Sequence, residues 1–159
     1  MKSIRCAVVA LLTLFLLVAC QAHGDRLLGF PPRLELESLR LIEDANAAQI
    51  ELVILLFNPN DVAVEVEDLQ LEFSLNEQRA LEFRRTLMLD IGARNRERIR
   101  LNAAPPAELV GQLEMLRDSG RGPMPYVLRG ELKIAGARPA PVGLSDFLHR
   151  MPGQPNRFR

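Results

Sequence analysis

The chain of 159 residues is poor in several residue types on which many functions depend. It has no tryptophan, one tyrosine, two histidines and two cysteines, and its 20 basic residues equal its 20 acidic ones. Nucleic-acid binding usually needs a basic surface, and single strands also need aromatic side chains on which bases stack. We therefore expect no nucleic-acid partner.

Patterns typical of catalytic and metal sites are also scarce. His23 and His149 are far apart, and neither has a second histidine or an acid at the spacing of metal ligands. No Gly-rich loop joins a strand to a helix, and no Gly-x-Ser-x-Gly sequence is present. Carboxylates are numerous, but nothing selects a pair for acid–base catalysis. We expect no enzymatic activity, no cofactor and no metal.

Long apolar runs are limited to the start of the chain. Residues 6–19 carry no charge and follow Lys2 and Arg5, but this run of 14 residues is too short for a spanning helix, which needs about 20. A positive start, a short apolar segment and small residues before a cleavage point are typical of a secretory signal peptide. The sequence therefore predicts that residues 1–19 are removed.

The residues at this cleavage point are Leu-Val-Ala-Cys, 17–20, which resemble the lipobox of bacterial lipoproteins. The resemblance implies that Cys20 is lipidated on its sulfur and acylated on its new amino group, which anchors the chain to a membrane. Gln21 stands where an aspartate favours the inner membrane, so the resemblance indicates the outer membrane, facing the periplasm. The alternative is a buried N-terminal segment that happens to end in cysteine.

Cleavage changes what the remaining chain can do. Removing residues 1–19 from 159 leaves 140, the size of one domain, with 18 basic and 20 acidic residues. Cys6 leaves with the signal and Cys20 carries the lipid. No thiol then remains for a disulfide, a thiolate metal site or a nucleophile, so the core alone must hold the fold.

Apolar and polar residues alternate through most of the rest of the chain, as in half-buried strands. The expected strands are 34–41, 48–58, 62–76, 80–92, 98–102, 126–135 and 140–144. The alternation slips at Glu37–Ser38 and at Glu67–Asp68, which predicts β-bulges. Gly130 lies inside a strand, which predicts close packing against a neighbour.

One segment, 105–120, has helical spacing, with leucines at 109, 113 and 116. Strands with a single helix between them predict an all-β fold, an antiparallel β-sandwich with one inserted helix. We divide the chain into a signal peptide (1–19), a tether (20–33), the sandwich domain (34–148) and an irregular, Arg-rich tail (149–159).

Several of these segments together carry a resemblance to a known family. They are PPRLELESLRLIE at 31–43, Asn58-Pro59-Asn60 after an apolar strand, VAVEVEDLQLEFSLN at 62–76, and PYVLRGELKI at 125–134, which contains Tyr126 and Gly130. Their order and spacing over residues 31–145 resemble the type 2 late-embryogenesis-abundant proteins, which share the water-stress and hypersensitive-response domain. Asn76-Glu77 departs from the Asn-Gly that the family often has there.

The resemblance implies a β-sandwich of about seven strands with one helix, similar to fibronectin type III. It also implies a protective role in desiccation or other stress, without enzymatic activity. Asn58, Pro59, Asn60, Tyr126 and Gly130 would be signature positions with a structural role. We therefore expect a protective or structural envelope lipoprotein. The alternatives are a module that binds an envelope protein at the outer membrane and a carrier of an apolar ligand between the sheets.

Four arginines, at positions 94, 96, 98 and 100, alternate with other residues and would share one face of a strand. Such a row could contact anionic headgroups or an acidic partner. It could also be a solvated face that protects a sheet edge from pairing. The same two interpretations apply to the arginines of the tail, Arg150, Arg157 and Arg159.

Overall fold

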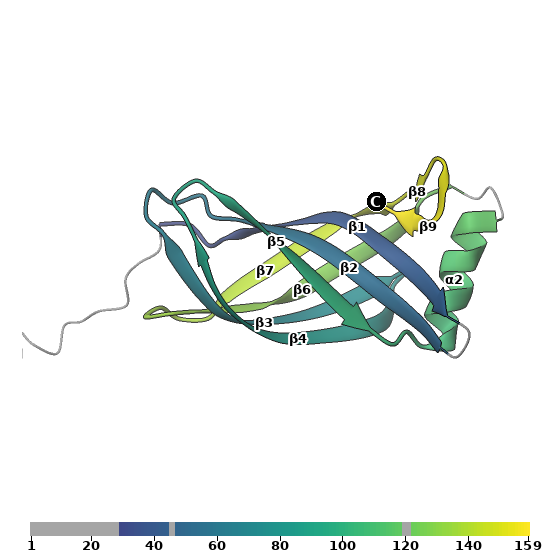
Figure 1. Ribbon diagram of the computed structural model, residues 1–159, viewed down its shortest axis with the longest axis horizontal. Helices are drawn as coiled ribbons and strands as arrows, with labels where there is room; N and C mark the ends of the chain where they lie inside the picture. The colour runs from purple at the N-terminus through teal and green to yellow at the C-terminus, as the bar shows by residue number, and fades with distance from the viewer. Residues whose placement is uncertain (1–28, 45–46, 119–121) are drawn as a thin grey trace, which may run out of the picture.

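The alternating segments form two antiparallel sheets that pack face to face, as the computed structural model shows for residues 29–44, 47–118 and 122–159 (Figure 1). The elements run in chain order as β1 (Arg33–Asp44), β2 (Ala47–Phe57), β3 (Val64–Leu75), β4 (Gln78–Ile91), β5 (Arg96–Ala103), α2 (Ala107–Asp118), β6 (Met124–Ile134), β7 (Ala140–Leu148), β8 (Arg150–Met151) and β9 (Gln154–Phe158). The order is β5-β2-β1-β9-β8 in one sheet and β4-β3-β6-β7 in the other. The predicted all-β sandwich with one inserted helix is confirmed.

The core lies between the two sheets and consists of the inward side chains of each strand. Leu52, Ile54 and Leu56 of β2, a strand paired with β1 and β5, are fully buried because they belong to the core cluster that also contains residues of the other sheet. Phe73 on β3 is also fully buried, and its ring lies 6.1 Å from the ring of Tyr126 on β6. Val62, the first residue of the expected strand 62–76, precedes β3 and is exposed.

Both predicted bulges are present. The pairing of β1 with β2 shifts between Leu36 and Ser38, and the pairing of β3 with both neighbours shifts between Val66 and Asp68. Leu34 and Leu39 are five positions apart, an odd spacing that would place them on opposite faces of a regular strand, yet both are buried. Since side chains alternate strictly along a regular strand, one extra residue must be accommodated between them.

Helix α2 covers one end of the sandwich (Figure 1). Its buried side chains are those of the predicted stripe, Leu109, Leu113 and Leu116. No helix among the described residues is long and apolar enough to cross a membrane.

The tail, expected to be irregular, is instead a β-hairpin. β8 and β9 pair with each other, and β9 also pairs with β1, so the described residues contain nine strands where about seven were expected. Phe158 anchors this hairpin, with only 1% of its surface exposed. The backbones of His149 and Arg159 exchange two hydrogen bonds of 2.7 and 2.9 Å. Alternation of apolar and polar residues did not predict these strands, because the hairpin has a single fully buried side chain, Phe158, among prolines and polar residues.

Helix α2 and the hairpin are also joined by polar contacts. Arg117 Nη1 donates to Asn156 Oδ1 at 3.1 Å, and Arg150 Nη1 donates to the carbonyl oxygen of Arg117 at 3.0 Å. The same Arg117 holds Asp118 through its Nε at 2.8 Å. The hairpin is thus attached on one side to β1 and on the other to the helix.

Candidate functional site

Two polar regions of the sandwich contain most of the residues that the sequence singled out. The first is the Asn58-Pro59-Asn60 turn after β2, whose three residues are all buried. Asn58 Nδ2 lies within hydrogen-bond distance of the carbonyl oxygens of Val62, Ile91 and Gly92, at 2.8, 3.1 and 3.0 Å. Its Oδ1 accepts from both the backbone and the side-chain nitrogen of Asn60, each at 3.0 Å. The Asn58 amide therefore connects the end of β2 to the end of β4.

Asn60 holds the chain that enters the domain. Its Nδ2 donates to the carbonyl oxygen of Phe30 at 2.8 Å, and its Oδ1 accepts from the Phe30 backbone nitrogen at 3.0 Å. Both amides are thus bonded to groups of this chain, either close to the turn or at Phe30. Among the described residues, no buried side-chain nitrogen or oxygen lacks a hydrogen-bond partner. We call Asn58, Pro59 and Asn60 with these contacts the asparagine cluster.

Tyr126 and Gly130 lie on β6 in the other sheet. Tyr126 packs on Phe73, and burial, with the nearby Asp146 carboxylate, raises the pKa of its hydroxyl to about 12. A Cβ built on Gly130 would lie 1.9 Å from the carbonyl oxygen of Gln70 on β3. No side chain fits at that distance, so the predicted close packing at Gly130 is confirmed.

The four alternating arginines do not share one environment. Arg94 precedes β5 and donates from Nε to Asp61 at 2.8 Å, which lowers the pKa of that carboxyl. Arg96 lies 3.5 Å from a Glu35 oxygen and 5.3 Å above the Phe57 ring. These contacts lie on the surface, which agrees with the interpretation of the row as the solvated face of an edge strand.

The other two arginines of the row lie at the middle of β5. Arg98 makes a bidentate contact with Glu37, at 2.6 and 2.8 Å. The side chain of Arg100 makes no hydrogen bond or ion pair within the described part of the chain. Its carbonyl oxygen accepts a hydrogen bond from Arg85 Nη1 on β4.

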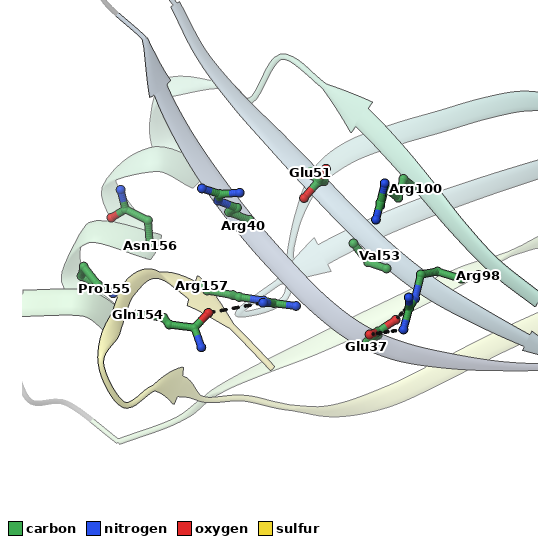
Figure 2. A pocket seen from close by; sticks show the side chains of 10 residues that line it. All are labelled: Glu37, Arg40, Glu51, Val53, Arg98, Arg100, Gln154, Pro155, Asn156 and Arg157. Carbon is green, nitrogen blue, oxygen red and sulfur yellow. Dashed lines mark hydrogen bonds and ion pairs between the residues drawn. The ribbon is translucent and has the colours of Figure 1, made fainter.

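The second polar region is a groove of about 730 Å³ on the outer face of the five-stranded sheet (Figure 2). It is lined by Glu37, Arg40, Glu51, Val53, Arg98, Arg100, Gln154, Pro155, Asn156 and Arg157. Figure 2 shows the side chains arranged around an open centre, with Arg157 extending from β9 toward the middle. We call this region the arginine groove.

Contacts within the groove fix some of its side chains and leave others free. Arg157 donates from Nη2 to the hydroxyl of Ser38 at 3.2 Å and from Nη1 to Gln154 Oε1 at 3.3 Å. Ser38 is itself buried, so it holds the guanidinium in place. Arg40 stands opposite Glu51 in the ladder of β1 and β2. Its side chain, like that of Arg100, makes no ion pair or hydrogen bond with the described residues.

Only part of this groove could be predicted from the sequence. Arg98 and Arg100 belong to the alternating row, and Arg157 was noted in the tail, but Arg40 was not singled out. Ser38 and Arg157 are 119 positions apart. Only the pairing of β9 with β1 brings them together, and the tail was not expected to form a strand.

A second hollow, of about 590 Å³, lies where β1 and β7 approach each other at the seam of the sandwich. Its apolar lining includes Leu36, Leu144 and Phe147, and Phe147 is half exposed. Arg150 and Arg159 stand among its polar lining residues. We call this the seam hollow.

The remaining candidate residues lie outside the described ranges or at the start of the tail. Cys20 and His23 lie outside the described residues, and His149 is exposed at the start of the tail. No group of three or more His, Cys, Asp or Glu side chains that could hold a metal ion occurs within the described ranges.

Comparisons with known proteins give distant similarities of structure. No family model matches the chain, and no curated protein sequence is significantly similar to it. The solution structure of AT1g01470 from Arabidopsis thaliana superposes with a TM-score of 0.49 and 12% identity, over 73% of this chain and 83% of that one. A crystal structure of a protein from Archaeoglobus fulgidus superposes with a TM-score of 0.45 and 8% identity, over 74% of this chain and 98% of that one.

Proposed function

We propose that this chain is a bacterial lipoprotein, anchored through acylated Cys20 to the outer membrane and facing the periplasm, with a non-enzymatic protective role in desiccation or envelope stress. The observation that carries the proposal is the order of segments in the chain. A charged start, a short apolar run and Leu17–Cys20 precede a β-sandwich of the kind that the family resemblance implies.

The anchor follows from the chemistry of Cys20. Each buried methylene of an acyl chain contributes about 0.8 kcal/mol, so two or more chains hold a protein on a bilayer stably. The chain that enters the sandwich is fastened at Phe30 by Asn60. Strand β1, which follows this fastening, runs toward the end of the sandwich where helix α2 lies (Figure 1).

Membrane fractionation of cells that produce Cys20→Ser tests the anchor. We expect an uncleaved or unanchored protein that no longer floats with outer-membrane vesicles. Cys6→Ser is the matched control, because it removes the other thiol of the chain, which lies within the predicted signal peptide. Unchanged flotation of Cys20→Ser would contradict the proposed anchor.

The protective role has its own test in cells that lack the gene. Survival after drying and after osmotic shock should fall on deletion and return with the parent gene, but not with Cys20→Ser. Equal survival of the deletion strain and the parent in both treatments would contradict the protective role and leave the anchor standing.

The seam hollow favours one second function, carriage of an apolar ligand. Its lining combines Leu36, Leu144 and Phe147 with charged side chains of both signs, which suits a molecule that has an apolar body and a polar group. Native mass spectrometry of the detergent-purified protein would detect such a ligand. A spectrum that contains only the lipidated chain would exclude a tightly held ligand.

A further inference from the structure

The arginine groove holds more positive charge than its own carboxylates neutralise. Arg98 is matched by Glu37, which leaves three arginines, at positions 40, 100 and 157, with Glu51 as the other carboxylate of the lining. Arg157 donates its hydrogen bonds to uncharged partners, the Ser38 hydroxyl and the Gln154 amide oxygen, so its charge is not neutralised by them. The groove therefore has an unmatched positive charge that a ligand of negative charge could neutralise.

The side chains of the groove suit phosphate oxygens. A guanidinium presents several N–H donors in a planar fork that matches phosphate, and these charge-assisted hydrogen bonds are stronger than neutral ones. The amides of Gln154 and Asn156 stand in the same lining and can add donors. The arginines come from three different strands of one sheet, so the sheet sets their spacing before a ligand arrives (Figure 2).

The length of chain before the domain brings this face within reach of a membrane. Residues 21–28 separate Cys20 from Gly29, and eight extended residues span at most about 26–29 Å. The groove begins at Glu37, which is about 13 Å along β1 from Arg33, and it includes Arg40 at about 23 Å. A lipid on Cys20 would therefore allow the groove to lie on the same bilayer.

We propose that the arginine groove binds phosphate groups of anionic lipid headgroups, so that the outer face of the five-stranded sheet lies against the membrane that holds the anchor. The inference rests on the proposed lipidation of Cys20. The anchor makes the contact intramolecular, which raises the effective concentration of headgroups at the groove. Each arginine near an anionic surface then favours contact by about fivefold.

A headgroup fits these observations better than a free phosphate compound. The groove is open along the sheet face and is not enclosed around a ligand (Figure 2). Three separated guanidinium groups can engage several neighbouring headgroups at once, whereas a small free anion would meet only some of them. The anchor keeps headgroups close to the groove permanently.

The test uses the acylated mature protein, reconstituted in vesicles of phosphatidylcholine alone or of phosphatidylcholine with phosphatidylglycerol in equal amounts. Asn102→Cys places a fluorophore on the same sheet face, because Asn102 is exposed and pairs with Glu51. Gln70→Cys places the label on an exposed site of the other sheet. Lipids with a nitroxide on the headgroup quench whichever label lies against the bilayer.

We expect phosphatidylglycerol to increase quenching at position 102 and not at position 70. Arg40→Gln with Arg100→Gln should reduce the equilibrium constant between the membrane-bound and the released orientation of the sheet by about fivefold for each arginine removed. These two side chains contact none of the described residues through hydrogen bonds or ion pairs, so the variant should fold. Arg84→Gln with Arg129→Gln removes the same charge from exposed positions on the other sheet and should leave quenching at position 102 unchanged.

Several outcomes would overturn the proposal. Equal quenching at position 102 in both lipids would do so, as would an increase that survives Arg40→Gln with Arg100→Gln. A fluorescence response to inorganic phosphate in neutral vesicles, without a response to phosphatidylglycerol, would assign the groove to a free anion instead. A protein that fails to float with any vesicle would contradict the Cys20 anchor itself, which is a different result from flotation with equal quenching.

Discussion

The asparagine cluster and the arginine groove are both polar, but their polar groups are satisfied in different ways. In the cluster, the buried amides of Asn58 and Asn60 bind backbone groups and each other. In the groove, the side chains of Arg40 and Arg100 face solvent without a partner among the described residues. The cluster therefore serves the fold, and the groove is free to serve a ligand.

This difference distinguishes residues that stabilise the fold from residues that are available to bind a ligand, which a sequence motif alone does not do. A buried amide whose hydrogen bonds are all internal contributes to stability, because its loss leaves carbonyl and N–H groups unpaired. An exposed arginine contributes little to stability, since even a surface ion pair is worth about 0–1 kcal/mol. Substitutions in the core and in the asparagine cluster should therefore destabilise the fold, whereas substitutions of the groove arginines should affect only the groove.

The largest effect should come from the anchor of the tail hairpin. Phe158→Ala removes a fully buried ring and should lower the free energy of unfolding by about 3–5 kcal/mol. Arg159→Ala, at the exposed neighbouring position, should change it by less than about 0.5 kcal/mol. Urea denaturation of both variants measures the difference. Similar values for the two would mean that the hairpin does not belong to the folded core.

A smaller loss is expected in the asparagine cluster. Asn58→Ala removes the amide that lies within hydrogen-bond distance of three carbonyl oxygens, and it should cost about 2–3 kcal/mol. The matched control is Asn102→Ala on the exposed face of β5, which should be nearly neutral. Thermal melts compare the two. A melt of Asn58→Ala like that of the parent would contradict the structural role of the cluster.

The close approach at Gly130 allows a comparison of two glycines. Gly130→Ala should destabilise by about 1–3 kcal/mol, because the new methyl group would overlap the carbonyl oxygen of Gln70. At Gly143, on the neighbouring β7, the nearest atom to such a methyl group is 3.5 Å away, an ordinary contact. Gly143→Ala should therefore be neutral or stabilising by about 0.5 kcal/mol. If denaturation ranks them in the opposite order, the register of β3 with β6 is wrong.

The smallest effect on stability should come from the groove. Arg40→Gln and Arg100→Gln should each change the free energy of unfolding by less than about 0.5 kcal/mol, since neither side chain has a partner among the described residues. Arg98→Gln breaks the exposed pair with Glu37 and should cost at most about 1 kcal/mol. A loss well above these values in denaturant would show that the groove arginines serve the fold.

The regular strands could be predicted from the sequence because their side chains alternate between core and solvent. The phase of the alternation changes between Leu36 and Leu39, and this change located the bulge in β1 at Glu37–Ser38. Gly130 was recognisable for a similar reason, because a glycine among large strand residues implies a neighbour at the Cβ position.

The tail hairpin and the arginine groove could not be predicted from the alternation of side chains. The pairing of β9 with β1 joins residues more than a hundred positions apart, and it depends on Phe158 finding a site in the core. Proline and polar residues surround Phe158, so the local pattern is that of an irregular segment. Arg40 and Arg157 become neighbours only through that pairing, which is why the alternating row at 94–100 gave an incomplete view of the groove.

The most direct test of the division between fold and groove compares two variants of the reconstituted protein that carries the label at position 102. Asn60→Ala should lower the melting temperature and leave the phosphatidylglycerol-dependent quenching of the folded protein intact. Arg40→Gln with Arg100→Gln should melt like the parent and lose that quenching. The opposite pattern, in which Asn60→Ala melts normally but loses the lipid response while the arginine variant keeps it, would contradict the division.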